Sequence, residues 1–351
     1  MKKVILFLTI LFIPLNVRGI SASSYIVMDS DNNRVLEGAN IHRKALIASI
    51  TKIMTAMVVI NNGALDETVT IGDEVLKSFG SGIYVSVGEK IKKEELLYGL
   101  MLRSGNDAAY ALAFNTGGSM EGFTMMMNSL AKSLKMNNTE FKNSAGLEDA
   151  FGENYSTVYD MALLSSYAIK NEEYRKIVGT KNITVKTDLK TYVWHNKNRL
   201  LSMYEYAIGG KTGFTEKARR TLVTNASKNN VNLTVVTFND DNDFNNHKNL
   251  YEKYFAKLKP YQILFKGPIE TKYPNTYIEN DYWMSLSNEE SNRVEITVNY
   301  YDNNATNIIG YAEIKLDGKI YHKENILIKK EKKEEKISLW EKIKRKIASL
   351  W

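Results

Sequence analysis

The order of strand-like and helix-like segments restricts the fold of this chain more than any other feature. Two short strand-like runs, at 23–29 and 34–40, are separated by the turn-prone sequence SDNN and predict a hairpin. The residues that follow are mostly helix-like, and strand-like runs return from about residue 181. We therefore expect the two ends of this region to meet in one sheet with helices packed against it, an α+β fold. The expected helices are 48–63, 94–118 with a break at 104–106, 120–136, 156–171 and 246–258, and the expected later strands are 182–187, 191–196, 219–227 and 232–238.

The pattern changes after Lys259-Pro260, where the last of these helices has ended. Short strand-like runs follow at 261–267, 293–300, 308–321 and 325–330. Asp317-Gly318 lies inside the third run and is a common two-residue turn between antiparallel strands. Residues 23–259 and 260–330 are therefore predicted to form two domains, the second a small β-sandwich.

The first 22 residues have the pattern of a secretory signal peptide. Lys2 and Lys3 precede an apolar stretch at 4–15, and small residues follow at Gly19, Ser21 and Ala22. The apolar stretch is shorter than the roughly 20 residues that a spanning helix needs. We expect an exported protein, with cleavage between about residues 19 and 22.

The segment 331–351 differs from the rest of the chain. Apolar residues recur in it at helical spacing, with Trp340 on the apolar side and Trp351 near it. From Lys329 to Lys346 the sequence has nine Lys or Arg against four Glu. A basic amphipathic helix of this kind suits an anionic membrane surface, so we expect the tail to hold the exported protein on the outer face of the bacterial cytoplasmic membrane. A helix docked on the domain and a coiled-coil partner are the alternatives.

Composition excludes several kinds of chemistry. The chain has no cysteine, so disulfides, zinc-thiolate sites and a cysteine nucleophile are ruled out. Its four histidines lack metal-ligand spacing, and His195 and His247 are expected to serve structure or surface. The net charge of +7 lies largely in the tail. We therefore expect no metal, no cofactor and no nucleic-acid partner.

Ser49 and Lys52 form an S-x-x-K motif inside an apolar, helix-like run. Residues three apart on a helix share a face, so the amine of Lys52 can reach the hydroxyl of Ser49. A free serine is a poor nucleophile, and a desolvated lysine whose pKa is lowered can act as its base. The motif alone is weak evidence, because many surface helices contain it.

Two further elements strengthen the case. Ser104-Gly105-Asn106 interrupts two apolar helical runs, and Lys211-Thr212-Gly213 is predicted just before a strand. Each could be an ordinary turn, with Asp107 capping a helix after the first. A phosphate-binding loop at 209–213 is excluded, since Glu205 stands where that motif needs glycine and a strand follows instead of a helix.

Taken in order, S-x-x-K, S-x-N and K-T-G resemble the motif set of the penicillin-binding protein and serine β-lactamase superfamily. The sequences ASITKIMTA, LMLRSGNDAAYALA, FKNSAGLED and GGKTGFTEKARRTLV look most like the low-molecular-mass D-alanyl-D-alanine carboxypeptidases. The resemblance covers about residues 23–330. It implies a transpeptidase-like domain, with an antiparallel sheet flanked by helices and a helical subdomain, then a small all-β domain and a C-terminal amphipathic helix.

The resemblance also implies a reaction. Ser49 would attack the D-Ala-D-Ala end of a peptidoglycan stem peptide, release the terminal D-alanine and form an acyl-enzyme. Lys52 would take the serine proton and Ser104 would relay a proton toward the leaving amine. β-Lactams would acylate Ser49 in place of the peptide. The base for deacylation is open, with Lys52 acting through a water as the default.

The remaining motif residues would bind substrate. Asn106 would bind the peptide backbone, Lys211 and Thr212 the terminal carboxylate, and Gly213 would let the peptide lie along a strand edge. The oxyanion would be held by the Ser49 N–H and by that of Phe214 or, preferably, Thr215. The sequence after K-T-G, Glu216 to Arg220, carries extra positive charge, which either favours anionic stem peptides or forms a solvated face.

Three alternatives stay open. A serine β-lactamase would need fast deacylation, and the E-x-x-L-N pattern of one class is absent. A transpeptidase of the same fold usually carries further modules. A catalytically weak penicillin-binding sensor or scaffold would use only the β domain and tail.

Overall fold

The computed structural model describes residues 19–302 and 306–329, in two compact units divided between Lys259 and Pro260. Almost all of the expected signal peptide and the whole of the expected tail helix, 331–351, lie outside the described residues. Within the described part, no helix combines the length and apolar character needed to cross a bilayer.

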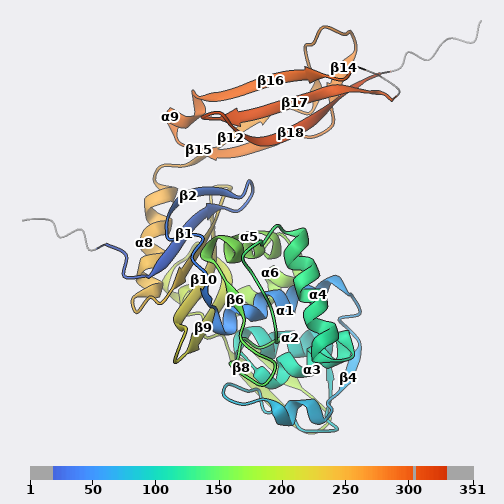
Figure 1. Ribbon diagram of the computed structural model, residues 1–351, viewed down its shortest axis with the longest axis vertical. Coiled ribbons are helices and arrows are strands. Elements are labelled where there is room, and N and C mark those ends of the chain that lie inside the picture. Colours follow the sequence, from blue (N-terminus) through green and yellow to red (C-terminus); the bar gives the residue numbers. More distant parts are fainter. Residues whose placement is uncertain (1–18, 303–305, 330–351) are drawn as a thin grey trace, which may run out of the picture. The chain divides into compact units, whose positions relative to one another are not determined.

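The first unit is built on one antiparallel sheet of five strands, in the order β2-β1-β11-β10-β9 (Figure 1). These strands are β1 (Ser24–Asp29), β2 (Arg34–Ala39), β9 (Ala207–Thr215), β10 (Arg219–Lys228) and β11 (Val231–Phe238). The two strands from the start of the unit thus pair with three from its end, and the α+β prediction is confirmed. Strand β9 is at the edge of the sheet, so one side of its backbone is free of any strand partner in that sheet.

Alternate residues of the central strands point to opposite faces of the sheet. Ile26 and Met28 of β1 belong to the core shared with the helices, whereas Val27 belongs to a second core that includes Phe244 and Tyr251 of helix α8 (Asp243–Phe255). Helix α5 (Val158–Ala168) covers the first face, with Thr157 as its N-cap. Both faces are therefore buried, and the sheet is a rigid frame for its edge strand.

The remaining helices form a subdomain around α1 (Lys52–Asn61), whose first eight residues are all buried. The expected helix 48–63 begins as a 3₁₀ turn, η1 (Ala48–Thr51), before α1. Helices α2 (Lys93–Leu102) and α3 (Asn106–Gly117) are separated at Ser104-Gly105, as predicted. The other helical segments of this unit are η2 (Asp73–Lys77), α4 (Met120–Ser133), α6 (Glu172–Gly179) and α7 (Leu200–Met203).

Three two-stranded ribbons complete the unit: β3 (Ala45–Leu46) with β6 (Tyr155–Ser156), β4 (Thr68–Thr70) with β5 (Lys90–Lys92), and β7 (Asn182–Lys186) with β8 (Thr191–His195). The first ribbon lies directly before η1 in the chain, so it helps to fix where the buried helix α1 starts.

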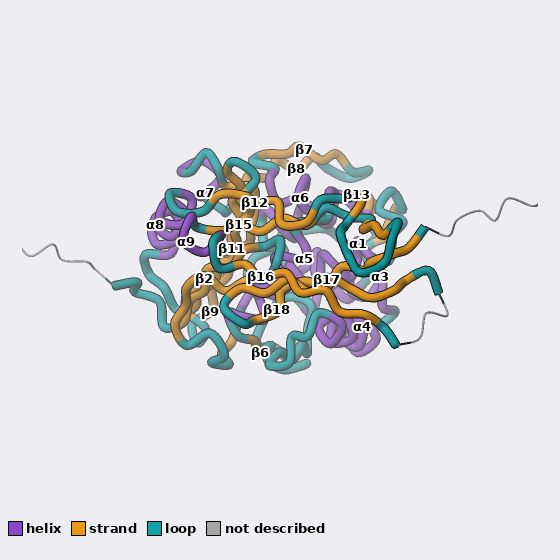
Figure 2. Tube along the Cα trace, turned by 90° about the horizontal axis from the view of Figure 1, so that it is seen from above, coloured by secondary structure: helices purple, strands orange, loops and turns teal. Residues whose placement is uncertain are grey.

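The second unit contains a five-stranded sheet in the order β13-β14-β18-β17-β16, whose long strands run side by side in Figures 1 and 2. Its strands are β13 (Gly267–Pro268), β14 (Thr276–Ile278), β16 (Val294–Tyr300), β17 (Ile308–Leu316) and β18 (Lys319–Ile328), and a ribbon of β12 (Lys259–Leu264) with β15 (Tyr282–Leu286) completes it with the one-turn helix α9 (Asn288–Ser291). Leu264 and Met284 of the ribbon share one core with Ile314 of the sheet. Asp317 and Gly318 both have positive φ and form the predicted turn between β17 and β18.

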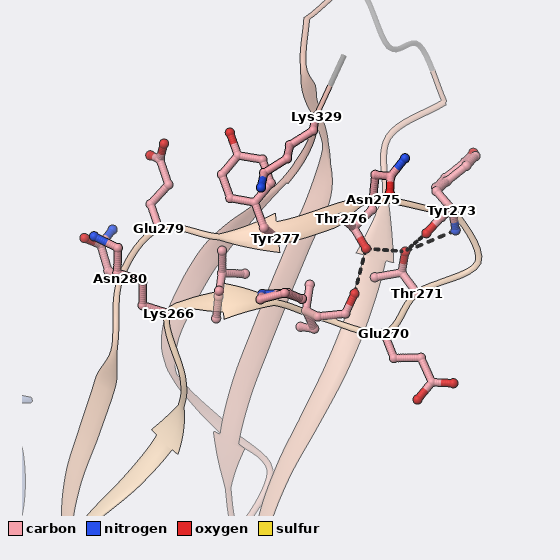
Figure 3. A pocket seen from close by; sticks show the side chains of 14 residues that line it. Lys266, Glu270, Thr271, Tyr273, Asn275, Thr276, Tyr277, Glu279, Asn280 and Lys329 are labelled. Carbon is pink, nitrogen blue, oxygen red and sulfur yellow. Dashed lines mark hydrogen bonds between the residues drawn. The ribbon is translucent and has the colours of Figure 1, made fainter. Parts of the chain in front are cut away.

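A hollow of about 760 Å³ lies on the second unit beside the hairpin of β13 and β14 (Figure 3). Tyr277 and Lys329 lie next to each other at its edge, with the Lys329 amine 5.8 Å from the centre of the ring. The hydroxyl of Thr276 donates to the Ile269 carbonyl at 2.7 Å and braces the hairpin.

Candidate active site

Ser49 lies in the turn η1 at the entrance to α1. The residue before it, Ala48, has φ +49, a left-handed conformation that residues other than glycine seldom adopt. The hydroxyl of Thr221 on β10 donates to the Ile47 carbonyl at 3.0 Å, so the sheet holds the start of the turn. The Ser49 side chain is only partly buried, while its neighbours Ala48 and Ile50 are buried. The fold thus presents one reachable hydroxyl on an otherwise enclosed segment.

Lys52 is completely buried and lies beside that hydroxyl. Its Nζ is 3.0 Å from Ser49 Oγ, 2.7 Å from Asn106 Oδ1 and 2.5 Å from the Ala145 carbonyl oxygen. Burial lowers the pKa of the Lys52 ammonium well below its usual value, and the charges of Lys211 and Lys197 lower it further against the opposing effect of Asp107. An amine that readily loses its proton next to a serine hydroxyl can act as a base.

The S-x-N segment reaches the same place from the junction of α2 and α3. Asn106 is the first residue of α3, and besides accepting from Lys52 it donates from Nδ2 to the Phe79 carbonyl at 2.5 Å. Ser104, two residues earlier, is buried and has φ +63. Its hydroxyl makes no hydrogen bond within the described residues and remains available to a substrate.

K-T-G lies within the edge strand β9, where the sequence predicts no strand, and the strand predicted after it is present as β10. Glycines at 209, 210 and 213 weaken the strand pattern in the sequence, and pairing with β10 forms the strand nevertheless. Lys211 is buried and donates from Nζ to the Thr212 carbonyl at 2.7 Å. Burial, and then the charge of Lys197, lower the pKa of Lys211 to about 7.

Gly213 brings β9 against the nucleophile. A Cβ atom on this residue would lie 3.0 Å from the Ser49 backbone nitrogen and 2.4 Å from Thr221 Oγ1. Any larger residue would push the strand away from Ser49, so glycine is required here for a close approach of two backbones. Strand β9 and the turn that carries Ser49 are therefore in direct contact.

Thr215, at the end of β9, contacts the loop 143–154. Its hydroxyl donates to Glu148 Oε1 at 2.9 Å, and Lys217 is bound by Glu148 at 3.0 Å and by Glu153 at 2.8 Å. Arg220 pairs with Asp243 at 2.7 Å. Two of the three cations after K-T-G, Lys217 and Arg220, are thus paired with carboxylates, whereas Arg219 is exposed and takes part in no ion pair among the described residues.

The loop 143–154 contacts both η1 and Lys52. Asn154 Nδ2 donates to Thr51 Oγ1 at 3.0 Å and to the Asn143 carbonyl at 2.9 Å, which fixes the loop against the turn η1. Ala145, whose carbonyl receives Lys52, is buried in this loop. The role of Ala145 could not be predicted from the sequence, because a residue of any type can offer its backbone carbonyl as an acceptor.

Lys197 is the second group that sequence reasoning missed. It follows β8, and its charge lowers the pKa values of Lys52 and Lys211. No local sequence pattern indicates that Lys197 influences the site.

The other titratable residues singled out in the sequence have structural positions. His247 is buried between the hydroxyls of Thr224, at 2.7 Å, and Thr237, at 3.0 Å, and burial lowers its pKa to about 3. Asp107 accepts from the backbone N–H groups of Ile83 at 3.0 Å and Tyr84 at 2.6 Å. His247 therefore stays neutral, and the Asp107 carboxylate ties the loop after η2 to the start of α3.

Searches for related proteins agree with this geometry. The family model for D-alanyl-D-alanine carboxypeptidase, peptidase S11, matches residues 14–242. The chain is 35% identical over 225 residues to D-alanyl-D-alanine carboxypeptidase DacF of Bacillus subtilis, covering 62% of this chain and 57% of the relative. It is 41% identical over 198 residues to a D-alanyl-D-alanine carboxypeptidase of a Streptomyces species, covering 51% of this chain and 67% of the relative. The chain thus spans a little over half to two thirds of the length of these relatives.

A solved structure extends the likeness beyond the first unit. Penicillin binding protein 5 of Haemophilus influenzae aligns with a TM-score of 0.74 at 25% identity, over 88% of this chain and 97% of that one. The match of the family model to well over half of the chain, together with the geometry around Ser49, identifies it: the chain belongs to the D-alanyl-D-alanine carboxypeptidase family of serine peptidases, S11.

Proposed function

We propose that this protein is a serine-type D-Ala-D-Ala carboxypeptidase that removes the terminal D-alanine from peptidoglycan stem pentapeptides. The observation that carries the proposal is the buried amine of Lys52, 3.0 Å from Ser49 Oγ, with a pKa held well below its usual value. No imidazole or carboxylate is needed to activate the serine when a neutral amine is at hand.

In the acylation step, Ser49 Oγ attacks the carbonyl of the penultimate D-alanine while its proton passes to Lys52. The oxyanion is held by the Ser49 N–H and by the N–H of Phe214 or Thr215 at the end of β9. The C–N bond then breaks, and the departing D-alanine amine takes a proton through the Ser104 hydroxyl. Water hydrolyses the ester, with Lys52 as the base.

Binding depends on the two sides of the groove. Lys211 and Thr212 hold the terminal carboxylate of the peptide, and the backbone of Gly213 lets the peptide pair with the free edge of β9. Asn106 faces the peptide backbone from the other side. Its Oδ1 and Nδ2 each have one contact in the protein, to Lys52 and Phe79, and an amide can make one more at each atom. β-Lactams would acylate the same serine.

The cellular setting is part of the proposal. Residues 1–22 export the chain, and residues 331–351 bind the outer face of the cytoplasmic membrane as a basic amphipathic helix. The composition of these segments supports export and membrane binding. This location would place the enzyme beside peptidoglycan.

The test measures D-alanine released from a pentapeptide ending in D-Ala-D-Ala, together with mass spectrometry of a penicillin adduct. We expect one adduct, on Ser49. The Ser49→Ala variant should lose both adduct and release, while Ser129→Ala, on the exposed face of α4, should keep both. Labelling that survives in Ser49→Ala refutes the assignment. A long-lived adduct favours a carboxypeptidase, whereas rapid hydrolysis of the penicillin would make the protein a β-lactamase.

A further inference from the structure

The start of the described chain lies beside helix α8 (Figure 1). The side chain of Ile20 packs on the second core, which α8 shares with the sheet. The hydroxyl of Ser21 donates to Asp240 Oδ1 at 2.5 Å and accepts from Asn246 Nδ2 at 3.0 Å. Ile20 and Ser21 therefore belong to the folded first unit, although both precede β1.

Asp240 is a completely buried carboxylate whose hydrogen-bond donors are all neutral. Besides the Ser21 hydroxyl, they are Asn246 Nδ2 at 2.9 Å and a backbone N–H of the same loop at 3.2 Å. Among the described residues Asp240 takes part in no ion pair, and Arg220, whose carbonyl accepts the Asp240 N–H, is paired with Asp243 at 2.7 Å. Leaving a buried charge unpaired is costly. A positive charge beside Ser21 would therefore stabilise the fold.

Removal of the expected signal peptide can supply this charge. Signal peptides are cut after a small residue, and Gly19, Ser21 and Ala22 each qualify. A cut after either of the two later residues would remove Ile20 and its packing, together with the hydroxyl that binds Asp240. A cut after Gly19 keeps both contacts, and Gly19 is exposed with open space around it. The fold thus favours one bond within the range that the sequence allows.

We propose that the exported chain begins at Ile20, and that its new α-ammonium pairs with the buried carboxylate of Asp240. A signal peptidase hydrolyses the bond between Gly19 and Ile20, and water supplies the hydroxyl of the new Gly19 carboxyl group and the hydrogen of the new Ile20 amine. This amine is protonated at neutral pH, since the ordinary pKa of an α-amino group is about 7.7 to 8.0. Consecutive Cα atoms are about 3.8 Å apart, so rotation of the freed end brings the amine to the carboxylate that Ser21 already binds.

The pair forms only after processing. Before the cut, residue 20 carries a neutral peptide N–H, and Asp240 has no cation. The exported chain is then more stable than its precursor because cleavage itself creates the charge. This inference rests on the export that we propose, and it is independent of the reaction at Ser49.

N-terminal sequencing of protein exported by a bacterial host identifies the cut. We expect Ile20 as the first residue, and Gly19→Leu should block or move the cut, because a small residue must precede the bond. An exported chain that starts at Ala22 or Ser23 overturns this inference and leaves export intact. Protein recovered only uncut and inside the cell contradicts export itself, and this inference with it.

Thermal unfolding of purified chains that begin at Ile20 tests the pair without reference to export. Acetylation of the α-amino group removes its charge and should lower the midpoint by about 3 to 8 °C. In Asp240→Asn the same acetylation should have almost no effect, because the partner is already lost. Asp241→Asn is the matched control, since Asp241 is the exposed neighbour, and acetylation should lower its midpoint as much as in the wild type. An equal effect of acetylation in Asp240→Asn and the wild type overturns the pair.

A nitrogen-15 NMR titration of the Ile20 amine covers the case in which Asp240→Asn does not fold. A carboxylate partner raises the pKa of an amine, whereas burial alone lowers it. Of the other carboxylates on this connection, Asp241 is exposed and Asp243 is bound by Arg220, which leaves Asp240 to act on the amine. We expect the pKa of the amine to lie above about 8.0. A value within or below the ordinary range overturns the pair.

Discussion

A Cβ atom on Gly146 would stand 1.9 Å from the carbonyl oxygen of Ala48. Gly146 has φ +78, and Ala48 is the residue before Ser49. The loop that supplies the Ala145 carbonyl to Lys52 and the turn that carries Ser49 therefore come into direct backbone contact. This contact holds the turn that carries Ser49 against the loop whose carbonyl receives Lys52.

Gly146→Ala should destabilise the protein and slow acylation together. The clash with Ala48 and the positive φ should cost about 3 kcal/mol or more of unfolding free energy, and the displaced turn should reduce the acylation rate at least about 10-fold. Urea unfolding and the rate of penicillin labelling measure the two effects.

Gly118 is the control for this substitution. It also has positive φ, at +72, but a Cβ atom there would meet nothing within 4 Å. Gly118→Ala should cost about 1 kcal/mol and leave acylation intact. If the two variants lose the same stability and both keep their acylation rate, the contact with Ala48 has no part in placing Ser49.

The acylation rate should rise with pH as Lys52 loses its proton, at a pH well below the usual lysine value of 10.5. The positive charge of Lys211 is one cause of the shift, beside burial, Lys197 and the opposing Asp107. Lys211→Gln removes a like charge, which raises the pKa of Lys52, so the rising limb should move to higher pH. Because the two lysines interact, the profile reports the pair rather than one residue.

Stopped-flow measurement of the maximal acylation rate against pH tests this shift without confusing it with weaker binding. Lys190 is a suitable control, since its amine bonds the Tyr84 carbonyl and its charge is not among those acting on Lys52. Lys190→Gln should leave the limb in place. If the rising limb of the pH profile of Lys211→Gln does not shift, or shifts to lower pH, the electrostatic coupling between the two lysines is contradicted.

Lys211→Met should stabilise the fold while it weakens substrate binding. The folded protein holds the pKa of Lys211 at about 7, far below its usual 10.5, so the buried charge costs stability at any pH where the unfolded chain is protonated. This cost is complete below about pH 7 and disappears as the pH rises toward 10.5. The variant should gain about 1 to 3 kcal/mol at pH 6 and progressively less at pH 8 and 9. Urea unfolding at these three pH values measures the gain in unfolding free energy. A gain that increases with pH would contradict the prediction.

Removal of residues 331–351 should release the protein from membranes and leave hydrolysis of a soluble pentapeptide nearly unchanged. The tail carries much of the net positive charge, so binding of the full chain to anionic vesicles should fall as salt rises. Sedimentation with vesicles of anionic and of neutral lipid measures both effects. A shortened chain that still sediments with anionic vesicles shows that another surface binds the membrane.

The parts of the site that depend on local spacing could be predicted from the sequence. Ser49 and Lys52 are three residues apart at the start of a helical run, and their contact follows from that spacing alone. Ser104-Gly105 separates two helices because the break interrupts two apolar runs. The meeting of the first and last strands also follows from the order of the segments.

Contacts between distant parts of the chain could not be predicted in this way. The Ala145 carbonyl and the Lys197 charge reach Lys52 through the folded structure, and no local pattern marks either residue. The sequence predicts no strand at K-T-G itself, where glycines disfavour one, yet pairing with β10 forms β9 there. The charge of Lys217 could be counted in the sequence, but its neutralisation by Glu148 and Glu153 depends on the loop 143–154.

The buried position of Lys52 also bears on drug tolerance. Its amine stays reactive because its surroundings are dry, and a substitution that let water in beside the Ala145 carbonyl would recharge it. Under the proposed function, such a change would slow attack on a β-lactam and on a stem peptide alike, because both reactions need the same base. Under the proposed function, a change that discriminates between an antibiotic and a peptide should instead lie at the free edge of β9, where an extended peptide pairs with the strand.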